Sequence, residues 1–468
     1  MLAMGVEEAT ATVEKYPMQM VPLLMREESN EDYEPKVVSF GPYHHGKEKL
    51  KFVEDFKPDA VKMFIEDSTL GEHVFINAIL SDINYIKGCY PKRFTSKYSD
   101  EQWAQMMFKD ACVILNYIGP TKHEESSKRI RTINDHLGTA VYANIRRDMY
   151  LLENQIPLRI LEILVCLRYQ SYDRKTFIND MEKYSFRMFF NAESGNIEEP
   201  PNENNKLGQN ALHLLEILRR VIVTGQDHDL ITMDHSCCNV NVLINCLEKS
   251  CCKCCKNDGK ENTHGLYAFR SVADLKSKGI HLRASGIRSL KGVRFGQTKL
   301  FHSAELKLPL LYVNMYTREF FKNMIAYELS PRVQESAWVK SVTDYVSFMK
   351  LLVATTEDVK ELRQKKIIIN SLGSDDDVLQ VYKSLNTYEA DNSSSYSIVK
   401  KGLEDHYNST IKMWMANLIT TYFSNPWTII ALVASLFLLC LDIVQTYYAV
   451  HPPKNGDDAN QSSSPPGF

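Results

Sequence analysis

Neither charge sign dominates this sequence, and the common catalytic motifs are missing. The 55 Lys and Arg residues nearly balance 58 Asp and Glu residues, giving a formal charge of -3, so no global field attracts nucleic acid or a membrane. A P-loop, a glycine-rich dinucleotide fingerprint, a G-x-S-x-G elbow and an H-E-x-x-H motif are all absent. We therefore predict no enzyme, no catalytic residue and no cofactor, and we do not expect nucleic acid as a partner.

We do not expect a cleaved signal peptide at the N-terminus. Glu7, Glu8 and Glu14 interrupt the apolar positions of the first twenty residues. With 44% hydrophobic and 24% charged side chains, the 468 residues can bury a large core in two domains or in one composite domain. We expect the bulk of the chain to begin in the cytosol.

A long apolar segment near the C-terminus is the strongest physical signal. No charged side chain occurs from Met413 to Leu441. A buried core helix would have to hide every face of this segment close to the chain end, whereas a bilayer solvates all faces equally. We predict that residues 425–450 form one transmembrane helix, with the lipid bilayer as its partner.

Residues at both ends of this segment fit a spanning helix. Asn425 is a suitable N-cap, and Pro426 suits the first helical position, where its missing N–H has no acceptor. Trp427 and Tyr447 are about 20 residues apart, or roughly 30 Å along a helix, which is the hydrocarbon thickness. Asp442 is predicted to be an intramembrane acid that either snorkels to the interface or is protonated, or else pairs with another transmembrane helix.

The rest of the sequence predicts an α+β protein that is predominantly α-helical, with a small antiparallel sheet in the C-terminal half. Apolar side chains recur at helical spacing from Trp103 to Leu115, and they alternate along Ile280 to Ala284, Val293 to Phe295 and Leu306 to Tyr312. We predict a flexible N-terminus (1–14), a mainly helical region (15–225), a Cys-rich variable loop (226–265), an α+β region (266–410), a juxtamembrane segment (411–424), the transmembrane helix (425–450) and a short polar tail (451–468).

A helix-turn-helix corner is predicted between Asp148 and Tyr169. One helix should stop near Gln155, because Ile156 precedes a proline, and the next should begin with Pro157. The polar residues before this break either act on a substrate or cap the exposed backbone groups. Structural capping is the favoured interpretation.

With these pieces placed, the sequence resembles the plant family known as domain of unknown function 247. Six segments carry the resemblance in this order: YEPKVVSFGPYHHG, DMYLLENQIP, LKLPLLYV with TREFFKNMIAYE, DYVSFMKLL, INSLGSDDDV and YFSNPW. The residues of these motifs that we take as candidate sites are Ser39, Gly41, Pro42, Tyr43, His44, His45, Gly46, Leu152, Glu153, Asn154, Gln155, Pro157, Asn323, Glu328, Pro426 and Trp427.

The resemblance implies a membrane-anchored plant protein of unknown molecular activity, with some relatives linked to self-incompatibility in grasses. A protein-interaction or signalling module with an unidentified protein partner is the favoured function. The alternative is a membrane-bound hydrolase or transferase with an unrecognised active site, for which groups such as His44 and Glu153 would have to gather in one place.

The two adjacent histidines of the first motif have competing interpretations. Imidazole serves as a metal ligand or a general base near neutral pH. His44 and His45 are neighbours in sequence, however, and should point apart. A turn between Gly41 and Gly46 is the favoured interpretation.

Seven of the eleven cysteines fall in one short stretch that has no counterpart in the family pattern. Two overlapping C-x-x-C spacings are formed by Cys251, Cys252, Cys254 and Cys255. Zinc binding, acylation and an inert reduced loop all fit this pattern, and the last is favoured, so we predict no metal site.

The region of predicted strands has a local excess of positive charge. No acidic residue occurs between Asp274 and Glu305, while seven basic residues do, namely Lys276, Lys278, Arg283, Arg288, Lys291, Arg294 and Lys299. Their alternation with apolar residues places several on the outer face of the sheet, where they contact water, anionic lipid or an acidic partner.

Overall fold

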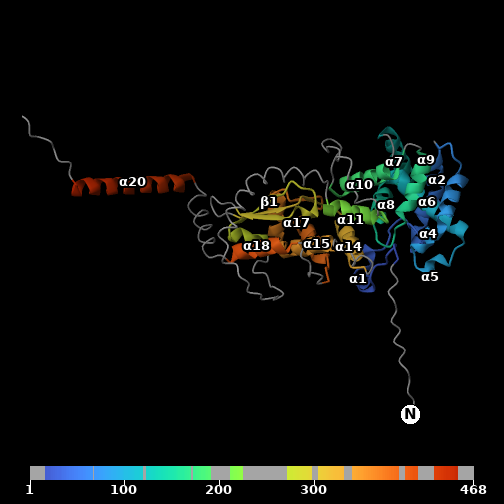
Figure 1. The fold of residues 1–468 in the computed structure, drawn as a ribbon, viewed down its shortest axis with the longest axis horizontal. Helices are drawn as coiled ribbons and strands as arrows, with labels where there is room; N and C mark the ends of the chain where they lie inside the picture. Colours follow the sequence, from blue (N-terminus) through green and yellow to red (C-terminus); the bar gives the residue numbers. More distant parts are fainter. Residues whose placement is uncertain are drawn as a thin grey trace, which may run out of the picture.

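The computed structural model describes residues 16–66, 68–119, 123–169, 172–190, 211–224, 271–297, 304–330, 340–388, 396–408 and 426–451. Helices from the first half of the chain gather at one end of an elongated body, and the strands and later helices form the other end (Figure 1). The helix α20 (Pro426–Val450) follows the body in the chain. The predicted class is confirmed, because helices dominate and the strands fall in the C-terminal half.

The described part of the first half of the chain contains helices, turns and loops but no strand. The α-helices are α1 (Leu23–Glu28), α2 (Lys51–Ile65), α3 (Glu72–Ser81), α4 (Ile83–Gly88), α5 (Lys92–Thr95), α6 (Asp100–Ile118), α7 (His123–Leu137), α8 (Thr139–Asp148), α9 (Leu158–Arg168), α10 (Arg174–Phe190) and α11 (Leu214–Thr224). Two 3-10 turns, η1 (Asn30–Asp32) and η2 (Glu48–Leu50), complete it. Helix α6 is its centre, since it packs against α2, α3, α7 and α9.

The second half alternates helices with short strands. Its elements are α13 (Val272–Ser277), β1 (Ile280–Ala284), η4 (Leu290–Gly292), β2 (Arg294–Gln297), β3 (Ala304–Leu308), β4 (Leu311–Val313), α14 (Thr317–Glu328), α15 (Ser341–Leu352), α16 (Thr356–Gln364), β5 (Ile368–Asn370), α17 (Asp375–Ser384) and α18 (Ser397–Tyr407). Ser374 caps α17, with Asp377 completing a capping box.

The strand pairing differs from the predicted antiparallel sheet. In the order β1-β3-β2, β3 pairs parallel with β1 and antiparallel with β2, and β4 pairs parallel with β5 in a separate two-stranded sheet. After β1 the chain reverses direction to form β2 and reverses again to form β3. Strand β3 therefore runs in the same direction as β1 and opposite to β2. Pro309 splits the single strand predicted from Leu306 to Tyr312, because it has no N–H for a ladder. Leu311 and Val313 consequently face the core in place of Leu310 and Tyr312.

The corner between α8 and α9 also differs from the prediction. Helix α8 ends at Asp148, not near Gln155, and α9 begins after Pro157, which is its N-cap. Residues 149–157 form a connector, and side chains bond several of its backbone groups, as described below. The predicted break before the proline is therefore correct, but the first helix was predicted too long.

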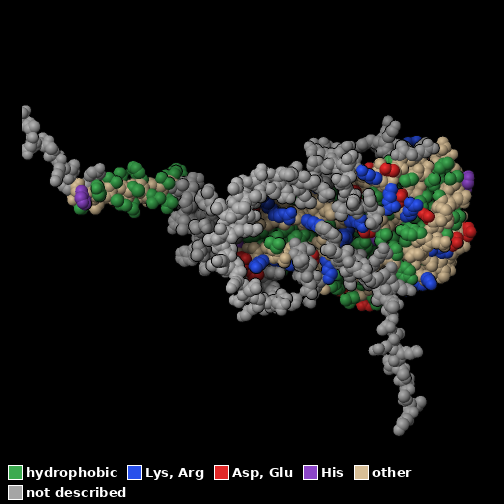
Figure 2. Space-filling model, in the orientation of Figure 1, with side chains coloured by type: hydrophobic (Ala, Val, Ile, Leu, Met, Phe, Trp, Pro, Cys, Tyr) green, Lys and Arg blue, Asp and Glu red, His purple; other side chains and the backbone are tan. Residues whose placement is uncertain are grey.

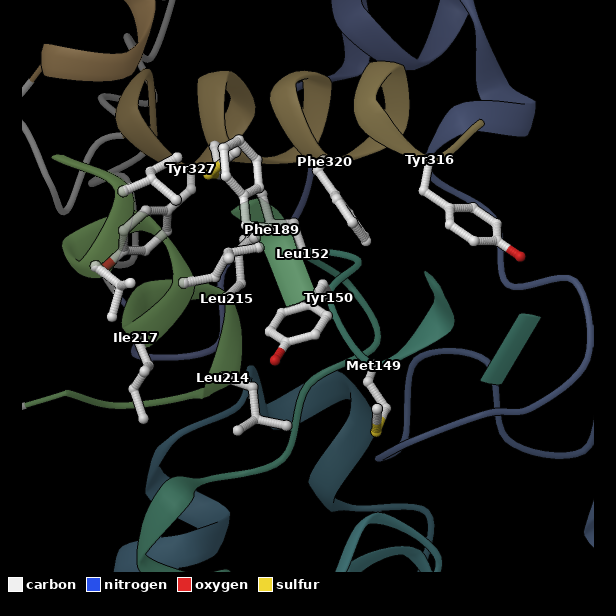
Figure 3. Close-up of a cluster of buried hydrophobic side chains, with 14 of the residues drawn as sticks. Met149, Tyr150, Leu152, Phe189, Leu214, Leu215, Ile217, Tyr316, Phe320 and Tyr327 are labelled. Atoms are coloured by element: carbon white, nitrogen blue, oxygen red, sulfur yellow. The ribbon is translucent and has the colours of Figure 1, made fainter. Parts of the chain in front are cut away.

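A shared apolar core joins the two halves beside this connector. Helix α14 lies over it, and α11 approaches from the side (Figure 3). Buried side chains from connector, α10, α11 and α14 meet there, including Tyr150, Leu152, Phe189, Leu215 and Phe320. The rings of Tyr150 and Phe320 pack edge to face with centroids 5.7 Å apart. The connector thus lies in the interior, where the two halves of the body pack together.

Candidate functional site

The loop from Ser39 to Gly46 lies directly against the connector. Gly41 has φ +72°, and a Cβ there would come within 2.9 Å of the carbonyl oxygen of Gln155 and 3.0 Å of the Tyr90 hydroxyl. That hydroxyl itself donates to the Gln155 oxygen over 2.9 Å. Glycine is needed at position 41 both for its left-handed conformation and for this close approach.

Asp148, at the end of α8, binds the chain that leads into this loop. Its carboxylate accepts hydrogen bonds from the backbone N–H groups of Lys36, Val37 and Val38 over 2.8 to 3.1 Å. Arg147 donates to the other carboxylate oxygen over 2.8 Å. Burial raises the pKa of Asp148 in spite of these donors. The carboxylate therefore serves as an anchor for three consecutive peptide groups.

Arg147 is fully buried and binds both the N-terminal segment and α14. Its guanidinium donates to the carbonyl oxygens of Glu31 over 2.9 Å and of Glu34 over 3.0 Å. Its Nε lies 3.4 Å from a carboxylate oxygen of Glu319 on α14. The planar fork of five donors suits this role, which a lysine could not fill.

Asn154 and Gln155 bind backbone groups on opposite sides of the connector. The Asn154 side chain accepts from the N–H of Phe40 over 2.8 Å and donates to the carbonyl of Val38 over 3.0 Å. The Gln155 side chain accepts from the N–H of Leu215 over 3.2 Å. Both amides are almost fully buried and bonded on both their oxygen and nitrogen ends. They cap backbone groups, as the sequence suggests, although half of these groups belong to segments distant in the chain.

Asn323 repeats this pattern from α14. It accepts from the N–H of Leu152 over 2.8 Å and donates to the carbonyl of Asp32 over 3.0 Å. Lys322, one residue before it, forms an ion pair of 2.6 Å with the Asp32 carboxylate. The N-terminal segment is therefore held between the connector and α14.

Glu328, at the end of α14, forms a second group of buried polar contacts, farther from the connector. It pairs with Arg219 of α11 over 2.7 Å and accepts from the N–H groups of Val342 and Thr343 over 3.0 and 2.8 Å. Burial raises the pKa of Glu328, and the arginine and backbone donors oppose this effect. Glu328 fixes the start of α15 relative to α11.

His44 and Glu153, which the sequence singled out separately, lie close together. Nε2 of His44 is 3.8 Å from a carboxylate oxygen of Glu153, and each residue is only 2% exposed. Glu153 is also held by the N–H of Val21, over 2.8 Å, and by Arg26. Burial raises the pKa of Glu153, with Arg26 acting in the opposite direction.

The protonation of His44 follows from its other nitrogen. Nδ1 lies 2.8 Å from the ammonium of Lys47, which only donates, so the ring proton is on Nε2 and faces Glu153. Burial, reinforced by Lys47, lowers the pKa of His44 to about 3. Burial alone would raise the pKa of Glu34, but donors from Lys47 and Arg26 outweigh it and lower that pKa to about 2. His44 is neutral near pH 7, and its Nε2 has no hydrogen-bond partner among the described residues.

The other histidine points to a different acidic group, as expected for neighbours in sequence. Nδ1 of His45 is 3.9 Å from a carboxylate oxygen of Glu54, and its ring packs edge to face on Tyr98 at 5.8 Å. The predicted turn is present, since Gly41 and Gly46 have positive φ angles of +72° and +81°. Each histidine thus belongs to its own cluster.

The cluster beneath His45 is built around a buried lysine. Lys57 forms an ion pair of 2.6 Å with Asp110 of α6 and donates to the carbonyl oxygen of Ser39 over 2.8 Å. Asp110 accepts from the N–H of Gly41 over 2.7 Å, and the Ser39 hydroxyl donates to Glu54. Burial raises the pKa of Asp110, while Lys57 lowers it. This cluster fixes the start of the loop on α2 and α6.

Remaining motif residues lie at less polar positions. Leu152 and Pro42 are buried, and Tyr43 donates to the carbonyl oxygen of Met18 over 2.7 Å. Trp427 and Asp442 are exposed on α20. Cys251, Cys252, Cys254 and Cys255 lie outside the described residues. Within the described ranges, no group of three or more His, Cys, Asp or Glu side chains could hold a metal ion.

Sequence reasoning missed several members of these clusters. Arg147, Lys57 and Glu34 carry no local signal, because their partners are far away in the chain. Asp110 does carry one, since it occupies an otherwise apolar stripe of α6. A charged residue at such a position must find a buried partner. The gathered side chains mainly bind backbone groups and one another, whereas Nε2 of His44, Nδ1 of His45 and one carboxylate oxygen of Glu319 are buried without a hydrogen-bond partner among the described residues.

Comparison with known proteins shows which family and which relatives the chain is similar to. The model of the domain of unknown function 247 family, described as a plant protein of unknown function, matches residues 18–441. The UPF0481 protein At3g47200 of Arabidopsis thaliana is 27% identical over 454 residues, covering 93% of this chain and 86% of the relative. The putative UPF0481 protein At3g02645 of the same plant is 22% identical over 183 residues, covering 38% of this chain and 33% of the relative. No solved structure matches significantly.

Proposed function

The chain belongs to the plant family called domain of unknown function 247, and from this premise we propose that it is a membrane-anchored protein-interaction module. In this proposal residues 425–450 cross a membrane once, and the body recognises a protein partner in a recognition or signalling role. The family and its uncharacterised relatives indicate no enzyme activity.

One observation carries the anchor proposal: α20 exposes apolar side chains on all sides. It is the helix in the described part of the chain that is long and apolar enough to cross a membrane, and its window Ile430–Tyr447 has no buried residue. Trp427 is 76% exposed and Leu436 is 56% exposed. Figure 2 shows hydrophobic side chains along the whole length of this helix. In water, each large apolar side chain left exposed forgoes about 1.5–3 kcal/mol of burial free energy, which a bilayer would supply.

The internal use of the motif residues supports an interaction module over a catalyst. Asp148, Asn154, Gln155 and Asn323 bind backbone groups of the N-terminal segment, the connector and α11. Such residues keep a recognition surface in a fixed shape without themselves contacting a ligand. The proposal therefore places the partner on the outer surface of the body.

Deletion tests the anchor. The chain without residues 425–450 should move from the membrane fraction to the soluble fraction after cell lysis, while remaining folded by circular dichroism. A chain lacking residues 452–468 is the control, because it keeps α20 and should stay with membranes. A folded chain without residues 425–450 that still sediments with membranes would show that α20 is not the anchor.

Glycosylation tests the orientation. If the body is cytosolic, the sequons at Asn392 and Asn408 should remain unmodified, and Asn460 should be the only one of the three that reaches the lumenal transferase. A glycosidase-sensitive mass shift is measured in each single Asn→Gln variant. A shift that is lost in Asn408→Gln but survives in Asn460→Gln would place the body on the other side.

Proximity labelling tests the protein partner. A biotin ligase is attached to the N-terminus of the full chain, and the control carries the same ligase on residues 409–468 alone. Proteins labelled by the full chain but not by the control are candidates that depend on the body. Identical labelled sets in the native tissue would contradict an interaction function of the body.

A hydrolase or transferase is the second candidate, and one observation favours it: Nε2 of His44 lies 3.8 Å from Glu153. Against it, both side chains are almost fully buried, and Glu153 is bonded to Val21 and Arg26. A fluorophosphonate probe offers a direct test through Ser39, whose hydroxyl donates to Glu54. Labelling of Ser39 in the native protein, lost on heat denaturation, would favour the hydrolase.

A further inference from the structure

The three-stranded sheet has one apolar face and one basic face. Ile280 and Leu282 of β1 and Leu306 of β3 point into the core, so alternate residues point outward. The register pairs Arg283 with Lys307, and Lys307 with Arg294. Three cations therefore form one row across three adjacent strands.

This row has little compensating charge. Glu305 is the acidic residue among the described outward positions, and it lies 3.2 Å from Arg283 and 3.6 Å from Lys307. The guanidinium of Arg294 donates instead to the carbonyl oxygens of Lys291 and Val293. Three cations and one carboxylate give this face a charge of +2, although the whole chain carries -3. Like charges directly opposite across strands destabilise a sheet, so an anionic partner would relieve a cost already present in the fold.

The basic row is also accessible. Arg283 has a side chain 70% exposed, and Arg294 is exposed as well. Figure 2 shows Lys and Arg side chains gathered over the part of the body where Figure 1 places β1. Lys276, on α13 just before β1, adds a cation that is paired with Glu361 over 2.9 Å.

The sheet is close in the chain to the proposed anchor. Helix α18 packs on the apolar side of the sheet, with the rings of Phe295 and His406 6.2 Å apart and His406 Nε2 3.2 Å from the carbonyl oxygen of Lys278. The chain leaves α18 at Asn408 and reaches α20 at Pro426. Even fully extended, this connection reaches only about 60 Å. A membrane that holds α20 is thus always within reach of the sheet, at a high effective concentration.

We propose that the outer face of the β1-β3-β2 sheet binds anionic lipid headgroups of the membrane in which α20 is anchored. This inference rests on the proposed anchor and adds a second contact with the same bilayer. Phosphate and carboxylate oxygens of the headgroups would accept from Arg283, Arg294 and Lys307. Each such cation should favour the docked state by about fivefold at an anionic surface.

The test uses the full chain in lipid nanodiscs with a photo-crosslinker in place of His281, which is an outward residue outside the basic row. Nanodiscs contain either phosphatidylcholine alone or phosphatidylcholine with one-quarter phosphatidylserine, with a fluorescent headgroup tracer in both. Irradiation should give a lipid adduct in the phosphatidylserine discs at a yield at least fivefold above that in phosphatidylcholine. The adduct should decrease at high salt, because exposed charges are screened.

A matched pair of triple variants shows whether the row itself is responsible. Arg283→Gln, Arg294→Gln and Lys307→Gln together should reduce the adduct at least fivefold. The control variant, Lys51→Gln with Lys62→Gln and Lys92→Gln, removes the same charge from exposed sites on other helices and should leave the yield unchanged. Equal yields in the two variants would overturn the proposal.

The two proposals fail in distinguishable ways. Co-elution of the chain with nanodiscs of phosphatidylcholine alone reports on α20 without the basic row, so its loss would refute the anchor. Co-elution with both lipid mixtures but equal adduct yields would refute lipid binding by the sheet while leaving the anchor intact. A single-stranded RNA or a poly-glutamate peptide is added in a separate arm. Cross-linking to either of these in preference to lipid would also overturn the assignment.

Discussion

The connector between α8 and α9 and the helix α20 place side chains in opposite surroundings. Around residues 149–157, polar groups lie in an apolar interior, and Asp148, Asn154 and Gln155 are satisfied by backbone partners within the body. Along α20, apolar groups are exposed, and the described body offers no surface that covers them. The connector needs nothing from outside the protein. The helix needs a medium that the protein does not supply.

This contrast separates structural from external roles among the motif residues. A buried polar group costs free energy unless it is hydrogen-bonded. Many hydrogen-bonded polar groups in one buried region therefore indicate that the segments meeting there are held in one fixed arrangement. An exposed apolar stripe on every face of a helix has the opposite meaning, because water is its least favourable surrounding. The connector is expected to control stability, and α20 to control location.

Removing the Asp148 carboxylate should give the largest loss of stability. In Asp148→Ala, three backbone N–H groups lose their acceptor and the buried Arg147 keeps only the more distant carboxylate of Glu319, which should lower the free energy of unfolding by roughly 3–5 kcal/mol. Urea denaturation in detergent measures it. Asp59→Ala, at an exposed carboxylate on α2, is the control and should be close to wild type. Equal midpoints for both variants would mean that the connector is not a stability centre.

Lowering the pH should reduce the free energy of unfolding, because His44 is neutral in the folded chain. Its pKa of about 3 in the folded chain is below the usual 6.5, so between these values the unfolded chain binds more protons and stability falls with falling pH. From pH 7 to pH 5 the loss should be about 2 kcal/mol. Glu34 contributes a similar loss only between pH 4.5 and 2, because its pKa is lowered to about 2.

The variant His44→Gln isolates this effect. It cannot titrate, so its stability relative to wild type should improve by about 2 kcal/mol from pH 7 to pH 5, whatever its packing costs at pH 7. Thermal unfolding of both proteins at half-unit pH intervals provides the comparison. A difference between the two proteins that is constant with pH would show that His44 is not held neutral by burial.

A smaller loss is expected from Gly41→Ala. The left-handed φ of +72° costs a Cβ-bearing residue roughly 1–2 kcal/mol, and the new Cβ would also press against the Gln155 carbonyl oxygen at 2.9 Å. Gly46→Ala is the matched control, since φ is +81° there but no atom lies within 4 Å of the added Cβ. The excess loss at Gly41 measures the close approach of loop and connector. Equal losses would mean that only backbone strain matters.

Local patterns in the sequence were sufficient for some of these features. The helical stripe of α6, the cap at Ser374, the start of α20 at Pro426 and the break before Pro157 depend on neighbours within a few residues. The family resemblance singled out Ser39 to Gly46 and Glu153 to Gln155 as candidate sites. It did not say that these two segments meet.

Features that depend on distant partners could not be read from the sequence. Helix α8 ends at Asp148 because that carboxylate binds residues 36–38, more than 100 positions away. The strand β5 was missed because Ile368–Asn370 is short and pairs with β4 across three helices. The parallel pairing of β1 with β3 likewise follows from the path of the chain and not from alternation, which is the same in both pairings.

The smallest effect on the body is expected from a substitution in α20. Leu436→Ala removes apolar surface that is 56% exposed and contacts no described part of the body, so the free energy of unfolding of the body should not change. The same substitution at Leu161 in the core of α9, where the side chain is fully buried, should cost about 2–5 kcal/mol. Urea denaturation followed by tryptophan fluorescence compares the two variants in the same detergent. If Leu436→Ala shifted the midpoint as Leu161→Ala does, α20 would pack on the body as a core helix, and the contrast between connector and helix would disappear.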